Sequence, residues 1–157
     1  MSTTPPPLNP HAGDFELAAV ELPEYALPVE QPQVPDATHE ARIVAALAAA
    51  TAAGLDALLV YGDREHFANI AYLTGFDPRW EEMLLVLVPG QTPVLLVGNE
   101  SEAYAADLRI RASVVRFAKF SLVGQPDPEQ LGLTEAFGLA GLSAAVTPRL
   151  GTVGWKF

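Results

Sequence analysis

Apolar residues in this chain gather into short runs of strand length, separated by turn residues. The run 57–61 is continuously hydrophobic, which is typical of a strand buried on both faces. The runs 83–88 and 94–97 are joined by a short connection with two prolines and a glycine, which predicts an antiparallel hairpin. Two further strands are expected at 114–117 and 151–156.

Helical patterns alternate with these runs. The clearest is 41–53, a run of strong helix formers that Gly54 closes and that Asp36 or Thr38 is expected to cap. Its apolar stripe should face a core and consists of Ile43, Leu47 and Ala50. The alternation of helix and strand predicts an α/β layer structure.

Three more helices are expected between the later strands. One spans 64–72, with Asp63 as its cap and Gly75 at its end. Another spans 100–109, beginning with acids and ending with bases as the helix dipole prefers. The third, 128–142, is weak because each of its three glycines costs about 1 kcal/mol relative to alanine.

The first 35 residues differ from the rest in composition. They hold eight of the 14 prolines, and there is no lysine or arginine before Arg42. Because proline fixes φ, this segment should be extended and polyproline-like. We therefore expect a Pro-rich acidic arm over 1–35 and an α/β domain over 36–157. The arm is either a tail of the domain or a segment that docks on a neighbouring subunit through its spaced apolar residues.

Charge and composition exclude several classes of function. The net charge is −10, which argues against nucleic-acid or membrane-surface partners because phosphates would be repelled. The absence of cysteine excludes disulfides, thiolate metal sites and a cysteine nucleophile. The apolar runs are far shorter than the roughly 20 residues that span a bilayer. With no signal-peptide pattern, the expected compartment is the cytoplasm.

Most catalytic signatures are missing from the sequence. It has no phosphate-binding glycine loop and no nucleophile elbow, and the three histidines lack metal-ligand spacing. Glu81 and Glu82 are adjacent, so on a strand they would point to opposite faces and could not easily share an ion. We interpret this pair as a solvated strand entry, and we predict no catalytic and no metal-binding residue in this chain.

Two polar clusters remain as candidate sites. The first follows the buried strand directly and comprises Asp63, Arg64, Glu65, His66 and Asn69. Sites in α/β sheets tend to form outside the carboxyl ends of strands, which favours this position. The alternative is local capping, in which Asp63 accepts the amide of His66 and Arg64 pairs with acids in solvent.

The second cluster is the loop 74–80, which combines a cation with two aromatics. Arg79 beside Phe76 and Trp80 suits carboxylate recognition or a protein interface. The alternative is an ordinary turn whose aromatic side chains fill the core.

Four pieces of the sequence resemble one family. The most specific is Tyr-Leu-Thr-Gly-Phe at 72–76. In their order and spacing, the pieces are similar to the N-terminal domain of the creatinase, prolidase and aminopeptidase P family, over roughly 22–157. They are GLDALLVYGD at 54–63, NIAYLTGF at 69–76, EMLLV at 82–86 and LLV at 95–97.

The resemblance implies a three-layer α/β domain with a mixed β-sheet flanked by helices. In that family, catalysis belongs to a following C-terminal "pita-bread" domain, which hydrolyses Xaa-Pro bonds with two divalent metal ions such as manganese, or acts on creatine without metal. That domain is not in this sequence. The N-terminal domain helps to form a dimer and closes over the active site. By the resemblance, Arg79 is the preferred contact for a substrate carboxylate, with His66 and Asp77 behind it.

Two hypotheses follow. In the first, the chain is a non-catalytic N-terminal domain of an Xaa-Pro peptidase-like hydrolase, which acts in homo-oligomerisation and active-site gating on a peptide or small-molecule substrate. The chain ends directly after an expected strand, on Trp155-Lys156-Phe157, which predicts a piece of a longer protein. In the second, the chain is a stand-alone binding or interaction module with the same fold.

Overall fold

The computed structural model describes residues 18–26, 29–30, 32–128, 130–142 and 147–154. The chain divides into two compact units, Met1–Pro32 and Gln33–Phe157. In the first unit, the described residues carry no helix or strand. This unit holds most of the expected arm, of which residues 1–17, 27–28 and 31 lie outside the described part.

The second unit is built on a five-stranded mixed sheet with the strand order β4-β3-β2-β1-β5. The central strands β1, β2 and β3 contribute most of the buried aliphatic side chains. The predicted strands 57–61, 83–88, 94–97 and 114–117 are thereby confirmed, each within a residue at either end. The strands are β1 (Ala57–Gly62), β2 (Met83–Leu87), β3 (Val94–Val97), β4 (Ser113–Arg116) and β5 (Leu150–Val153).

The sheet contains both pairing directions. β2 pairs antiparallel with β1 and with β3, which confirms the predicted hairpin. β4 pairs parallel with β3, and β5 pairs parallel with β1. The predicted last strand, 151–156, is observed as β5, while residues 155–157 lie outside the described part of the chain.

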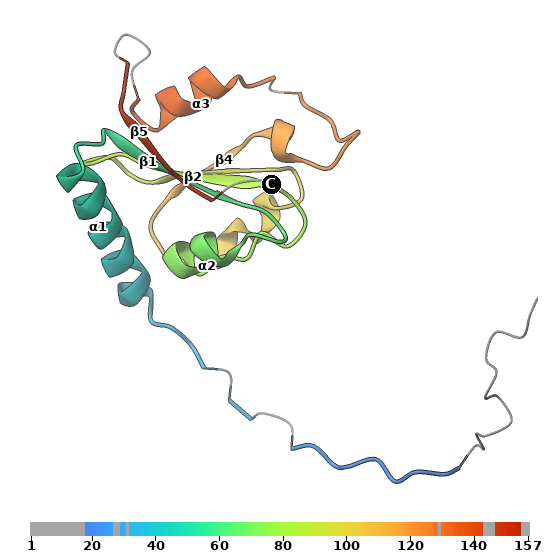
Figure 1. Ribbon diagram of the computed structural model, residues 1–157. Coiled ribbons are helices and arrows are strands. Elements are labelled where there is room, and N and C mark those ends of the chain that lie inside the picture. The colour runs from blue at the N-terminus through green and yellow to red at the C-terminus, as the bar shows by residue number, and fades with distance from the viewer. Residues whose placement is uncertain (1–17, 27–28, 31, 129, 143–146, 155–157) are drawn as a thin grey trace, which may run out of the picture. The chain divides into compact units, whose positions relative to one another are not determined.

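Helices cover both faces of the sheet, as Figure 1 shows. On one face, α1 (Asp36–Ala52) and α2 (Ala68–Thr74) bury Ile43, Ile70 and Leu73 against the inner strands. On the other face, α3 (Leu133–Leu139) buries Ala136 in a second apolar cluster. The predicted α/β class and the three layers are confirmed. No helix in the described ranges is both long and apolar enough to cross a membrane.

The helix boundaries differ from the predicted ones. α1 begins at Asp36, with Pro35 as its cap and no side-chain capping bond, so neither Asp36 nor Thr38 acts as the cap. The Pro35 carbonyl itself accepts the amide of Thr38, 2.9 Å away. Asp36 instead places a negative charge in the first turn, where the helix dipole favours it.

The other three helices are shorter than predicted. The expected helix 100–109 is the short 3₁₀ helix η1 (Glu102–Asp107), and it ends there because the amide of Arg109 donates to the Thr74 carbonyl at 2.9 Å. The expected helix 128–142 is limited to α3 by the glycines around it: Gly132 is its N-cap and Gly141 has a φ of 86°. The helix predicted from Arg64 is α2, which begins only at Ala68.

α1 holds the end of α2 through side chains. The ring nitrogen Nδ1 of His39 lies 3.0 Å from the Tyr72 carbonyl, and Arg42 donates to the same oxygen at 2.8 Å. The Arg42 guanidinium also lies 4.0 Å from the centre of the Tyr72 ring. These contacts fix the position at which the chain leaves α2 for the loop of the second polar cluster.

Candidate functional site

Both predicted polar clusters lie at one end of the sheet. Gly62, the last residue of β1, pairs with Met83, and Met83 pairs with Val97 at the end of β3. Val97 in turn pairs with Arg116 at the end of β4. The carboxyl ends of β1, β3 and β4 therefore lie at the same end of the sheet as the start of β2. Sites in α/β sheets form outside the carboxyl ends of strands.

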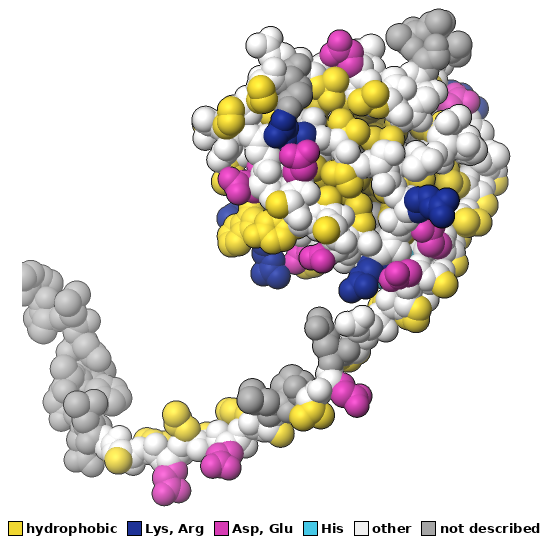
Figure 2. All heavy atoms as spheres, turned by 180° about the vertical axis from the view of Figure 1, so that it is seen from behind, with side chains coloured by type: hydrophobic (Ala, Val, Ile, Leu, Met, Phe, Trp, Pro, Cys, Tyr) yellow, Lys and Arg dark blue, Asp and Glu magenta, His cyan; other side chains and the backbone are white. Residues whose placement is uncertain are grey.

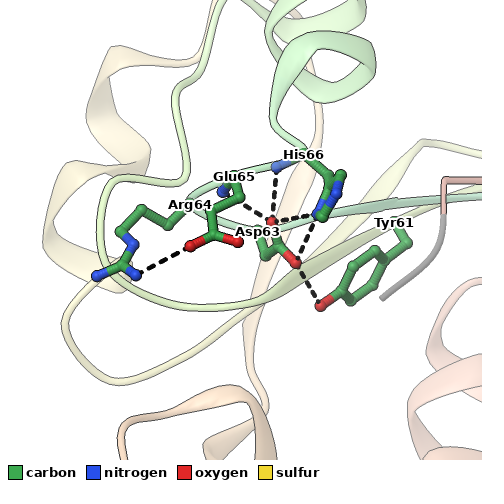
Figure 3. Close-up of polar contacts among 5 residues, drawn as sticks. All are labelled: Tyr61, Asp63, Arg64, Glu65 and His66. Atoms are coloured by element: carbon green, nitrogen blue, oxygen red, sulfur yellow. Dashed lines mark hydrogen bonds and ion pairs between the residues drawn. The ribbon is translucent and has the colours of Figure 1, made fainter. Parts of the chain in front are cut away.

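Asp63 organises the turn that follows β1 (Figure 3). Its Oδ1 accepts the backbone amides of Glu65 and His66, at 2.8 and 2.7 Å, and lies 3.1 Å from Nδ1 of His66. Its Oδ2 accepts the hydroxyl of Tyr61 at 3.2 Å. The predicted bond from the His66 amide is confirmed, but the prediction of Asp63 as the cap of α2 is wrong. Asp63 closes its own turn, and the N-cap of the helix is Phe67.

The electrostatics of this turn follow from its hydrogen bonds. Partial burial alone would raise the pKa of Asp63, but the amides of His66 and Glu65 and the side chains of His66 and Tyr61 outweigh it and lower that pKa. Burial raises the pKa of Tyr61, and the charges of Glu82 and Asp63 raise it further. Since an ionised Asp63 can only accept, Nδ1 of His66 carries a proton, and Nε2 of the neutral ring is an acceptor.

The loop between α2 and β2 holds the second cluster. Gly75 ends α2 with a φ of 72°, and Phe76 is buried in the core. Arg79 forms an ion pair with Asp77 at 3.5 Å, and both side chains are largely exposed. Trp80 is 55% exposed. The core-filling alternative therefore holds for Phe76 and fails for Trp80.

Glu81 differs from its prediction as a solvated residue. It is only 3% exposed, and its two carboxylate oxygens accept the amides of Ser101 and Glu100 at 2.8 and 3.1 Å. Gly98 leaves room for the carboxylate, because a Cβ there would lie 2.7 Å from Oε1. Glu81 thus joins the start of β2 to the segment that leads into η1.

A pocket of about 350 Å³ connects the two clusters. The first cluster contributes Asp63, Arg64 and Glu65 to its walls, and the second contributes Trp80. His66, Asp77 and Arg79 do not line it, although His66 is bonded to Asp63. Asn69 is exposed on α2 and lies outside it as well. The remaining walls are Glu81, Glu82 and the segment Phe120, Ser121, Leu122 and Val123.

Sequence reasoning missed Tyr61, Glu81 and the segment 120–123. The segment lies beyond β4 and carries no motif, so only the sheet register could have placed it beside Asp63. Tyr61 lies within an apolar run, where its hydroxyl gives no signal. Within the described residues, no group of three or more histidine, aspartate or glutamate side chains is placed to hold a metal ion.

Residues 42–142 match the family of the Creatinase/Prolidase N-terminal domain. Among solved structures, the chain is similar to an Xaa-Pro aminopeptidase from Streptococcus pyogenes, with 26% identity over 52% of this chain and 57% of that one, and a TM-score of 0.42. It is also similar to a dipeptidase from Mycobacterium ulcerans, with 22% identity over 53% of this chain and a TM-score of 0.41.

A third similar structure is the creatinase/prolidase N-terminal domain of an X-Pro dipeptidase from Streptococcus pyogenes. It is 17% identical over 72% of this chain and 99% of that one, with a TM-score of 0.39. No curated protein matches the chain. The chain spans only 24% of the length of the dipeptidase and 57% of that of the aminopeptidase.

Proposed function

We propose, on the premise that this chain belongs to the creatinase/prolidase N-terminal domain family, that it is the non-catalytic N-terminal domain of an Xaa-Pro peptidase-like hydrolase. The observation that carries the proposal is the family match, which covers residues 42–142 and so includes α2, α3, most of α1 and four of the five strands. Under this proposal, the domain assembles the enzyme as a cytoplasmic homodimer or higher homo-oligomer and closes over the active site.

Chemistry belongs to a following domain in this proposal. By analogy with the family, two divalent metal ions such as manganese would be bound in that following domain. The substrate is a peptide with an Xaa-Pro bond or a related small molecule.

Arg79 is the proposed contact for a substrate carboxylate. Its side chain is 69% exposed and that of its partner Asp77 is 45% exposed, so the pair is accessible to a ligand carboxylate that would compete for the same donors. Asp77 orients the guanidinium before substrate arrives. Nε2 of His66 is an acceptor while the ring is neutral, so it would accept a hydrogen bond from a donor group of the substrate.

Two experiments test the proposal in order. Sequencing the gene beyond the codon for Phe157 should reveal a pita-bread domain in the same frame, and its absence would refute the proposal. With manganese and the dipeptide Ala-Pro, the 157-residue chain alone should give no hydrolysis, whereas the longer product should be active.

The role of Arg79 is tested in the longer product. Arg79→Ala should raise KM for Ala-Pro by about tenfold, because this change corresponds to the free energy of one hydrogen bond to a charged group. The melting temperature should stay unchanged. Arg111→Ala, which removes another exposed guanidinium, is the matched control. Equal KM values for the two variants would exclude Arg79 as a substrate contact.

The second candidate function is a stand-alone interaction module whose contact surface is the arm. It is favoured by the apolar residues spaced along the arm, which include Leu22 and Val29. Deletion of residues 1–35 should then reduce the sedimentation coefficient of an oligomer to that of a monomer. Unchanged assembly after the deletion would exclude the arm as the contact surface.

A further inference from the structure

The lining of the pocket between the two polar clusters includes an apolar group of residues. This group consists of Trp80, Phe120, Leu122 and Val123. Trp80 and Leu122 are 55% and 51% exposed, and Val123 is fully exposed. Large apolar side chains that remain in water around a hollow are typical of a surface that another molecule covers.

Most of the remaining lining is acidic. Asp63, Glu65, Glu81 and Glu82 face a single cation, Arg64, which gives the lining a net formal charge of −3. The charges of Glu82 and Asp63 already act on a neighbour, since they add to the effect of burial that raises the pKa of Tyr61. A pocket with this potential favours a cationic occupant.

Two of these carboxylates are fixed before any ligand arrives. Glu81 is held by the amides of Glu100 and Ser101, and Asp63 by those of Glu65 and His66. Each oxygen of Glu81 accepts one of these bonds and keeps a second lone pair for a ligand, whereas Oδ1 of Asp63 already accepts both of its amides. The Arg64–Glu65 ion pair, by contrast, is 69% and 61% exposed and can rearrange at little cost.

We propose that this pocket binds an arginine side chain presented by a peptide segment of a partner protein. A guanidinium is planar, so it can stack on the exposed indole of Trp80 and donate to carboxylates at its edge. Leu122 and Val123 provide apolar surface that the residues flanking the arginine in a peptide can cover. Free arginine has no such residues and would leave this surface exposed. The inference goes beyond the proposed function and does not depend on it.

A fluorescence titration tests the inference. The chain has two tryptophans, so Trp155→Phe leaves Trp80 as the single indole reporter. The probe is acetyl-Leu-Arg-Leu-amide, compared with the same peptide carrying citrulline, which keeps the shape of arginine and loses its charge. The arginine peptide should give a saturable change that weakens with salt, and the citrulline peptide should bind about tenfold more weakly or not at all.

Variants locate the binding within the pocket. Glu82→Gln should weaken binding about threefold at low salt, whereas Asp107→Asn, which removes the same charge from an exposed position outside the pocket, should have no effect. Trp80→Leu, measured by titration calorimetry, should weaken binding about threefold because the cation–π contact is lost while apolar bulk remains.

Three results would overturn the inference. Equal binding of the citrulline peptide would exclude a cation-selective pocket. Equal effects of Glu82→Gln and Asp107→Asn would assign the attraction to the overall charge of the protein. Binding of arginine amide as tightly as the tripeptide would indicate a small-molecule site in place of a peptide-docking surface.

Discussion

Glu81→Ala should destabilise the fold by about 3 kcal/mol, although a pair of adjacent glutamates looks like exposed surface. Hydrogen bonds to a charged group contribute about 1.5–3 kcal/mol each, and Glu81 accepts two of them. Ser101 is 2% exposed, so its amide would lose its partner without gaining water. The amide of Glu100 is only partly buried and can be rehydrated, which keeps the expected loss below the sum of the two bonds.

The assay is urea denaturation followed by far-UV circular dichroism at pH 7. Glu81→Gln should lose about 1.5 kcal/mol, because its amide oxygen can replace one acceptor and its NH₂ group cannot replace the other. Glu102→Gln is the matched control: its ion pair with Arg116 is at the surface, so the change should stay within about 0.5 kcal/mol.

A double-mutant cycle separates this network from a general loss of packing. Gly98→Ala alone should cost about 1–3 kcal/mol because the new methyl group would collide with the Glu81 carboxylate. In the Glu81→Ala background, the same change should cost much less. Additive effects, or a Glu81→Ala variant as stable as the parent chain, would refute the reasoning.

Three further predictions concern the turns around the pocket. Because folding lowers the pKa of Asp63, its ionised form stabilises the fold above the ordinary value of 3.8, and this contribution disappears as pH falls below it. Asp63→Asn should therefore be less stable than the parent at pH 7, and the difference should be smaller at pH 3, by urea denaturation. Because the pKa of Tyr61 is raised, Tyr61→Phe should leave the absorbance change at 295 nm between pH 9 and pH 11 unaltered. Gly75→Ala should lower stability by about 1–3 kcal/mol, because φ is 72° and the added Cβ would lie 3.0 Å from Cβ of Arg109.

The strands could be predicted from sequence because their signal is local. Each of the central strands β1, β2 and β3 is a nearly uninterrupted apolar run, and burial on both faces requires this. The helix ends could not be predicted as well, since they depend on partners far away in the sequence. Arg109 donates to Thr74, 35 positions earlier, and this contact ends η1 before the dipole pattern would.

The candidate site shows the same limit. The Asp63–His66 contact spans three residues and follows from capping rules, so the sequence predicts it. The burial of Glu81 depends on amides 19 and 20 residues later, and no property of a Glu-Glu pair indicates them. The pocket also needs Phe120 and its neighbours, which reach Asp63 only through the pairing of four strands. The roles of Arg79, His66 and Asp77 remain predictions that the proposed experiments test.

The pairing of β5 with β1 sets an order of events during synthesis. A ribosome releases α1, β1, the hairpin of β2 and β3, and then β4 before β5, so a four-stranded sheet can form while one side of β1 still lacks its neighbour. That side is closed only when β5 emerges, together with the two bonds between Asp56 and Arg149, at 2.8 and 2.7 Å. Until then, the nascent domain exposes an apolar edge strand. Such a strand can be bound by a chaperone or can pair with other chains and aggregate.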